Sequence, residues 1–474
     1  MQRRARNKRK KLSLPSIPKE KSDLRESTLK KIHKIYLVIA LLFGVAFSIG
    51  MPLFSEPDGQ WHYIVESSMV GLSNDMSVYG EQNTSGSYVA AIQNYRNGTY
   101  FQNYYETKVR LIPISQQYLR GTNNLPSKTS FYYLARVIPA IGIWIGYHIY
   151  PSMGVMVTFG RLLNMLVLTL LTYWIIKRVR KGKLLFTIIA LSPVFLGTIS
   201  SLSHDAPSLV LGALMISEVI NIIDRKVITR NSILRLLIFS IFVRFVAKTN
   251  IDLLILLVPL VFIFIPFFKR NRKSVWEIIP KGVKIIAGFV VVLLGIIVVF
   301  HVTRQYGGPL SVLGRFWMNA TFNFQTTPSL VVSNLNNVLT QPFIGQNMMP
   351  YWLTTAWFVM LFAGGLSEKK YIEDKGISLG GFVLFVLSIV AVYYGIYNWN
   401  NGTMNSNVVQ GLIIGPQGRY FTPTLFLFAL IFGYKKSKLK LNLSTGVLAA
   451  FLVLVVVTNF LLIFDSYFNI FYIA

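Results

Sequence analysis

Residues 54–63 carry side chains that could perform acid–base chemistry, in the order Phe-Ser-Glu-Pro-Asp-Gly-Gln-Trp-His-Tyr. A carboxylate at Glu56 or Asp58 could take the proton of an attacking hydroxyl group, and His62 lies in the same stretch. We therefore predict Asp58 as the general base, Glu56 as the alternative carboxylate and His62 as a supporting residue. Pro-Asp-Gly is also a common turn sequence, so this stretch needs further polar groups around it to form a site.

Three further polar groups precede or follow long apolar runs. They are Asp205 in the sequence Ser-His-Asp, Lys248 after an apolar run, and 415–420, which reads Gly-Pro-Gln-Gly-Arg-Tyr. Lysine and arginine suit the charge of a phosphate group, and arginine can bind it through two nitrogen atoms. We predict that Lys248 and Arg419 bind phosphate, and that Asp205, Gln417 and Tyr420 support the site.

Each of these residues also has a plain structural interpretation. Asp205 could cap the helix that begins at 206, because an aspartate at this position accepts backbone N–H bonds. Lys248 could extend towards lipid headgroups, and Arg419 could bind a lipid phosphate non-specifically. The occurrence of all these groups next to membrane-type segments favours one shared polar site.

No cofactor is assigned from the sequence. The chain has no cysteine, which excludes disulfides, thiolate metal sites and cysteine nucleophiles. Glu56 and Asp58 could share a divalent metal ion through their oxygen atoms. The sequence offers no second oxygen cluster, so a metal is the less favoured alternative.

The composition is that of a membrane protein. Hydrophobic residues make up 53% of the chain and the mean hydropathy is +0.51. Apolar runs of roughly 15–24 residues match helices that cross a hydrocarbon core of about 30 Å. The 47 lysines and arginines against 18 acidic residues are typical of cytoplasmic loops, so we predict no nucleic-acid partner.

The apolar runs and the basic loops together predict the topology. Residues 1–34 form a basic cytoplasmic arm, 35–464 a multi-span domain, and 465–474 a short outer tail. Alternation across the bilayer predicts about eleven transmembrane helices, with the amino terminus inside and the carboxyl terminus outside. The predicted spans are 35–53, 153–176, 184–202, 206–223, 233–247, 251–268, 283–302, 351–366, 377–397, 420–434 and 444–464.

Three long connections are predicted on the outer side, at about 54–152, 304–350 and 398–419. The first would carry interfacial helices, with 131–150 lying in the interface or re-entering the membrane. Its tyrosines and Trp61 could stack on sugar rings or pack in the interface. This topology brings Asp58, Asp205, Lys248 and Arg419 to one side of the membrane.

These groups suit a glycosyl transfer at the outer face. A carboxylate would deprotonate an acceptor hydroxyl, and cations would hold the phosphate of a lipid-linked sugar. A transporter or flippase of lipid-linked sugars is the main alternative, although it would need internal repeats or broken helices at mid-membrane. A non-catalytic envelope-assembly protein is a third possibility.

The same motifs resemble those of the DUF2142 family of bacterial membrane proteins. The family pattern Pro-Asp-Glu-x-x-His is similar to 57–62, where Gly59 replaces the glutamate. The sequence at 160–164, Gly-Arg-Leu-Leu-Asn, resembles an arginine-bearing second span, which adds Arg161 to the predicted phosphate-binding residues. The stretch 201–206 resembles a Ser-x-Ser-x-Asp-Ala turn, and 417–423 resembles Gln-Gly-Arg-Tyr-x-x-Pro.

The resemblance extends in order from about 35 to 464, and Lys248 lacks the proline that usually follows it in the family. It implies an all-α GT-C-like fold in the bacterial cytoplasmic membrane. It also implies a polyprenyl-phosphate sugar donor and transfer to an envelope glycan or lipid acceptor.

Overall fold

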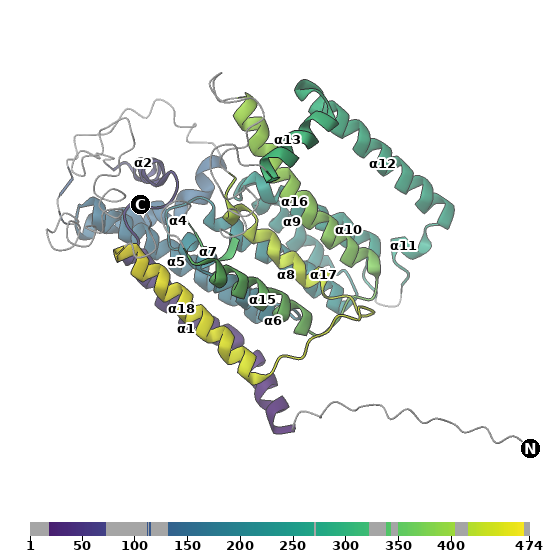
Figure 1. Cartoon of the computed structure of the whole chain (residues 1–474), viewed down its shortest axis with the longest axis horizontal. Helices are drawn as coiled ribbons and strands as arrows, with labels where there is room; N and C mark the ends of the chain where they lie inside the picture. Colours follow the sequence, from purple (N-terminus) through teal and green to yellow (C-terminus); the bar gives the residue numbers. More distant parts are fainter. Residues whose placement is uncertain are drawn as a thin grey trace, which may run out of the picture.

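The computed structural model describes residues 19–72, 111, 113–114, 131–269, 272–321, 338–342, 349–402 and 416–468. In these ranges the regular elements are all helices, apart from three isolated β-bridges. Six helices are long and apolar enough to cross a membrane. They are α1 (Lys19–Gly50), α5 (Met153–Arg178), α8 (Ala206–Arg225), α12 (Lys281–Thr303), α16 (Lys375–Gly402) and α18 (Thr445–Phe468). The described chain is therefore an all-α, polytopic membrane-type protein, as predicted (Figure 1).

Shorter helical segments complete the bundle. They are α2 (Gly59–Met69), η5 (Phe131–Arg136), α4 (Val137–Ile149), α6 (Lys183–Ala190), α7 (Pro193–Ile199), α9 (Arg230–Phe245), η6 (Thr249–Leu256), α10 (Leu257–Phe264), α11 (Val275–Ile278), η7 (Arg304–Tyr306), α13 (Pro309–Thr321), α15 (Tyr351–Ser367), η8 (Gly418–Tyr420), η9 (Thr422–Leu427) and α17 (Phe428–Ile431). The other predicted spans fall on these shorter segments.

The helices connect two ends of the bundle, which we call the basic end and the site end. At the basic end, the carboxylate of Glu373 bridges Lys226, after α8, and Lys435, after α17, at 2.5 and 2.7 Å. These two lysines hold the pKa of Glu373 down at about 2. At the site end, Oγ of Ser466 in α18 lies 3.0 Å from Sδ of Met51, which directly follows α1. The two ends thus tie together segments that are distant in the sequence.

The predicted span 184–202 is divided in the structure into α6 and α7. Ser192 caps α7 by accepting a hydrogen bond from the backbone N–H of Phe195, and Pro193 occupies the first turn of the helix. The carbonyl of Leu191, left free by the break, accepts a hydrogen bond from Asn459 of α18. Hydropathy predicts a continuous span here because the residues on both sides of the break are apolar.

Helices α4 and α5 form a close hairpin. A Cβ atom at Gly142 would lie 2.5 Å from the carbonyl oxygen of Phe159, and one at Gly146 would lie 2.9 Å from the Cα of Met156. The absence of side chains at these glycines lets the two backbones touch. The 131–150 segment, expected in the interface or as a re-entrant piece, is therefore packed along α5. This contact fixes the position of Arg136 at its start.

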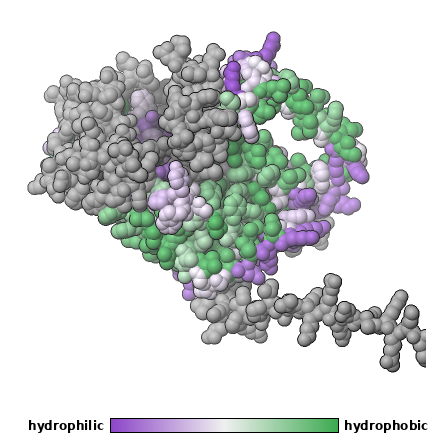
Figure 2. Space-filling model, in the orientation of Figure 1, coloured by the Kyte–Doolittle hydropathy of each residue, from purple (hydrophilic) through white to green (hydrophobic). Residues whose placement is uncertain are grey.

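Burial differs sharply between helices. In α8, 89% of the most apolar window is buried, whereas none of the corresponding window in α12 is. In Figure 1, α12 stands apart from the bundle and is joined to it through α11 and α13. The visible surface of α12 is apolar, with hydrophilic side chains near the ends of the molecule (Figure 2). Such a distribution is expected for a helix whose surroundings are lipid.

Candidate functional site

The site end gathers polar residues from five segments of the chain. Asp58 and His62 come with α2, Arg136 with the start of α4, Asp205 with the start of α8, Lys248 with the start of η6, and Arg419 with η8. Because these segments end at the same side of the bundle, residues up to 214 positions apart are in direct contact. Of the predicted residues, Asp205, Lys248 and Arg419 are in direct contact around the Asp205 carboxylate.

Asp205 is the centre of a cluster of cations. Its Oδ2 accepts a hydrogen bond of 2.7 Å from Nε of Arg419, and its Oδ1 lies 3.0 Å from Nζ of Lys248. The carboxylate is 6% exposed. Burial raises the pKa of Asp205, but Lys248, Arg419 and His204 oppose burial and hold it well below its usual value. Asp205 is thus an ionised, buried carboxylate. No side-chain cap bond to α8 is present, in contrast to the capping interpretation.

Tyr420 and Gln417 complete this cluster. The ring of Tyr420 lies beneath both cations, with Nζ of Lys248 3.9 Å and Cζ of Arg419 5.2 Å from its centre. The backbone carbonyl of Tyr420 accepts a 2.7 Å hydrogen bond from Asn250. Gln417 precedes η8, and its Oε1 is buried without a hydrogen-bond partner. The predicted residues Lys248, Arg419 and Tyr420 therefore contact one another.

Arg419 retains binding capacity. It is 5% exposed, yet its Nη1 is buried and makes no hydrogen bond. An unsatisfied buried donor costs free energy, about 1–3 kcal/mol for a typical group, and a ligand oxygen would remove that cost. Lys248 lies beside it, and its side chain is 29% exposed. Together they place two positive charges at the site, and the Lys248 side chain is partly exposed.

Glu56 and Arg161, both predicted as site residues, bind each other. They form an ion pair of 2.7 Å with side chains 0% and 2% exposed. The second oxygen of Glu56 accepts the backbone N–H of Leu202, while Arg161 donates to the carbonyls of Met51 and Pro52. This pair ties the segment after α1 to α5 and to the α7–α8 turn. These contacts favour a structural role for the two residues over proton transfer or phosphate binding.

Asp58 is the exposed carboxylate of the opening stretch. It precedes α2 with φ 59°, a left-handed conformation, and its side chain does not cap the helix. Its backbone carbonyl accepts a hydrogen bond from the N–H of His62. His62 is 1% exposed, and its ring centre lies 5.1 Å from that of His204. Asp58 is thus one helical turn from a histidine that reaches the Asp205 cluster.

Two residues of this region were not predicted as site residues. Arg136 lies between the two histidines, and Glu66 of α2 has its Oε1 3.7 Å from Nη1 of Arg136. Glu66 is fully buried, and neither oxygen makes a hydrogen bond. Burial raises the pKa of Glu66 well above its usual value. Two signals were available in the sequence: an arginine within an apolar segment, and a glutamate one turn after His62.

The described residues contain no group of three or more His, Asp or Glu side chains that could hold a metal ion. The structure therefore gives no site for the metal considered above within the part of the chain that it describes.

The tyrosines of the first long connection lie outside the described residues; they are Tyr79, Tyr88, Tyr95, Tyr100, Tyr104 and Tyr105.

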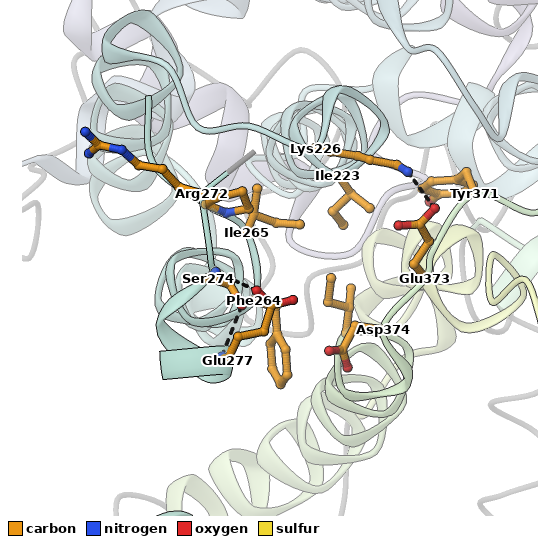
Figure 3. Close-up of a pocket in the computed structure, with 12 residues that line it drawn as sticks. Ile223, Lys226, Phe264, Ile265, Arg272, Ser274, Glu277, Tyr371, Glu373 and Asp374 are labelled. Carbon is orange, nitrogen blue, oxygen red and sulfur yellow. Dashed lines mark hydrogen bonds and ion pairs between the residues drawn. The ribbon is translucent and has the colours of Figure 1, made fainter. Parts of the chain in front are cut away.

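A pocket of about 340 Å³ lies at the basic end (Figure 3). Among its polar residues, Lys226 is bound to Glu373, and Ser274 and Glu277 form a capping box (Figure 3). Helix α8 separates this pocket from Asp205 by about 30 Å, given 1.5 Å per residue. The pocket is therefore remote from the predicted site residues.

Comparison with known proteins agrees with these membrane features. The DUF2142 family, described as predicted membrane proteins, matches residues 41–428. The chain belongs to this family. No curated protein and no solved structure matches it. The matched range includes Asp58, Asp205, Lys248 and Arg419, so the whole cluster lies within the family's common region.

Proposed function

We propose that this DUF2142 protein is a membrane glycosyltransferase that takes a sugar from a polyprenyl-phosphate donor. The observation that carries the proposal is Arg419, a buried arginine with an unbonded Nη1 beside the half-buried Lys248. Asp205 and Tyr420 hold these two cations at the end of the helix bundle. A phosphate at the membrane surface would receive charge-assisted hydrogen bonds from both.

In the proposed reaction, Asp58 accepts the proton of the acceptor hydroxyl as its oxygen attacks the anomeric carbon. The bond from that carbon to the donor phosphate oxygen breaks, and the phosphate leaves with the electron pair. Arg419 and Lys248 stabilise the charge that develops on it. The attack inverts the configuration at the anomeric carbon. Exposure of Asp58 supports this role, because an acceptor must reach the base.

The proposal includes a GT-C-like architecture of about eleven crossings in the bacterial cytoplasmic membrane, with the site end outside. The acceptor would be an envelope glycan or lipid. Lysines and arginines around Lys226 and Lys435 support a cytoplasmic position for the basic end. The alternation of helices between the two ends supports the remaining crossings.

A transporter or flippase is the second candidate, because α6 and α7 form a broken helix. Such breaks bind substrates in some transporters when their free backbone groups line a cavity. Here Ser192 is fully buried, and Asn459 satisfies the carbonyl of Leu191. The polar groups at this break are thus used within the protein, which favours the transferase.

The test compares envelope glycans by mass analysis in cells that make the wild-type protein, Asp58→Asn or Asp224→Asn. Asp224 is the matched control, since it is a carboxylate near Arg180 and Lys181 at the basic end. We expect the sugar addition to be lost only in Asp58→Asn, with equal amounts of protein in the membrane. Full addition by Asp58→Asn would overturn the assignment of the base.

A further inference from the structure

Arg136 binds two histidines at once. Its Nη1 lies 2.7 Å from Nδ1 of His62, and its Nη2 lies 3.2 Å from Nδ1 of His204. The two rings meet edge to face. The guanidinium thus holds together α2, the start of α4 and the α7–α8 turn. Arg136 and His62 are each 1% exposed, so these contacts are shielded from water.

The chemistry of the guanidinium determines the state of both rings. All its nitrogen atoms carry N–H donors and none accepts a hydrogen bond. Each contacted Nδ1 must therefore be the unprotonated acceptor, which places the single ring proton on Nε2. For His204, this proton is on the nitrogen that lies 3.7 Å from Oδ1 of Asp205. Neither ring then has a free basic nitrogen on the side of Arg136.

We propose that Arg136 is a positioning residue that holds His62 and His204 as neutral imidazoles protonated on Nε2. His204, with its side chain 30% exposed, then offers an N–H donor beside Lys248 and Arg419. The three residues surround the Asp205 carboxylate, and the N–H groups that Asp205 does not accept, such as Nη1 of Arg419, are donors for an oxyanion such as phosphate. This part rests on the proposed function, whereas the protonation state of the histidines does not.

The charges around the two rings favour the neutral form. Burial lowers the pKa of His204 to about 4, with Lys248, Arg136 and Arg419 lowering it further and Asp205 opposing them. Burial also lowers the pKa of His62. The groups that face His62 are Arg136, His204, Asp205 and Arg419. Oε1 of Glu66 lies 3.7 Å from Nη1 of Arg136, the nitrogen that contacts His62, and burial raises the pKa of Glu66 well above its usual value, which favours the neutral acid beside the arginine.

The proposal has a direct spectroscopic test, because the chain contains only five histidines. The full-length protein would be labelled with ¹⁵N-histidine, placed in lipid bilayers and measured by solid-state NMR. His62→Gln and His204→Gln identify the two signals. We expect both rings to be neutral and protonated on Nε2 from pH 8 to pH 5. A proton on Nδ1, or an imidazolium at pH 7, in either wild-type ring would overturn the proposal.

Arg136→Lys tests the positioning role, because the single ammonium nitrogen of lysine cannot replace Nη1 and Nη2, which contact His62 and His204 separately. We expect at least one of the two rings to become protonated on Nδ1, or to show both tautomers, in this variant, while Arg178→Lys, at the basic end of α5, leaves both unchanged. Unchanged tautomers in a folded Arg136→Lys protein would contradict the positioning role. The wild-type spectrum remains decisive even if Arg136→Lys does not fold.

Inorganic phosphate serves as the probe of the donors on His204, Lys248 and Arg419. Its addition should shift the Nε2 signal of His204 and leave that of His148, an exposed histidine on α4, unchanged. The absence of a shift at His204 would overturn the binding of an oxyanion by these three donors. The proposed glycosyl transfer is judged separately by Asp58→Asn, so failure of one inference can be distinguished from failure of the other.

Discussion

At the scale of single residues, the Glu56–Arg161 pair shows how a charged residue next to a candidate site can be structural. Both partners are buried, and removal of one charge leaves the other unpaired. Breaking such a pair typically costs about 3–5 kcal/mol. We expect Glu56→Gln to reduce the free energy of unfolding by about this amount, measured by thermal or denaturant unfolding in detergent.

A double-mutant cycle with Arg161→Met provides the control for this prediction. Residues in direct contact usually show coupling of about 0.5–3 kcal/mol, so the double variant should lose less stability than the sum of the two single variants. Additive losses would contradict the structural pairing. If Glu56→Gln lost sugar addition while its stability was unchanged, Glu56 would instead be assigned to proton transfer.

The Asp205 cluster predicts a pH dependence of stability. The folded-state pKa of His204 is lowered to about 4 from 6.5, so the folded protein resists protonation that the unfolded chain accepts. Stability from this group is fully present above pH 6.5 and is lost as pH falls towards 4. The lowered pKa of Asp205 acts in the same direction at still lower pH, as its carboxylate becomes protonated.

We therefore expect the melting temperature of the wild-type protein in detergent to fall between pH 7 and pH 4.5. His204→Gln should fall less over this range, because glutamine does not titrate. His148→Gln is the matched control, since His148 is exposed and far from Asp205 in the sequence. Equal pH dependence of all three proteins would contradict the environment described for His204.

The sequence predicted the residues that meet at this site better than it predicted their roles. Asp205, Lys248 and Arg419 could be placed together because apolar runs and basic loops assign each to the same membrane side. The sequence could not show that Arg161 differs in role from these residues, because its partner Glu56 reaches it only when the segment after α1 packs against α5. Arg136 was missed as a site residue because its contacts join three segments distant in the sequence.

At the scale of elements, the spacing of α4 and α5 depends on glycines. A methyl group at Gly142 would meet backbone atoms of Phe159 and Gly160 within 3 Å, and these atoms cannot move aside without shifting the helix. We expect Gly142→Ala to destabilise the protein by about 1–3 kcal/mol through overpacking. The displacement of α4 should also disturb Arg136, with a change in the His62 NMR signal.

Gly288 on α12 provides the control for this substitution, because a Cβ atom there would meet nothing within 4 Å. Alanine favours a helix over glycine by about 1 kcal/mol, so Gly288→Ala should be neutral or stabilising. Equal destabilisation by both substitutions would contradict the close hairpin. Thermal unfolding of the two variants in the same detergent decides between these outcomes.

Element boundaries show what hydropathy can and cannot predict. The existence of α1, α5 and α16 follows from their apolar runs, since a hydrocarbon core demands about 20 such residues, but α1 begins at Lys19, before its apolar span at Leu29–Gly50. The division into α6 and α7 was not predicted, because it depends on Ser192 and Pro193 within an otherwise apolar stretch. A cap bond and a partner on α18 make this break stable, and neither is visible in a hydropathy profile.

At the scale of the whole molecule, the orientation in the membrane is the property on which the proposed outer-face chemistry depends. The chain has no cysteine, so single cysteines can report the position of each end without background. His148, next to the start of α5 at the site end, and Lys436, after α17 at the basic end, are both exposed. Intact cells would be treated with a membrane-impermeant maleimide.

We expect His148→Cys to be labelled in intact cells and Lys436→Cys only after the membrane is opened. The physical reason is the retention of Lys and Arg on the cytoplasmic side during insertion, which places Lys226, Lys435 and their neighbours inside. The reverse pattern would place Asp58, Lys248 and Arg419 in the cytoplasm. The donor phosphate and the acceptor would then have to be cytoplasmic, and an outer-face transferase would be excluded even if Asp58→Asn abolished activity.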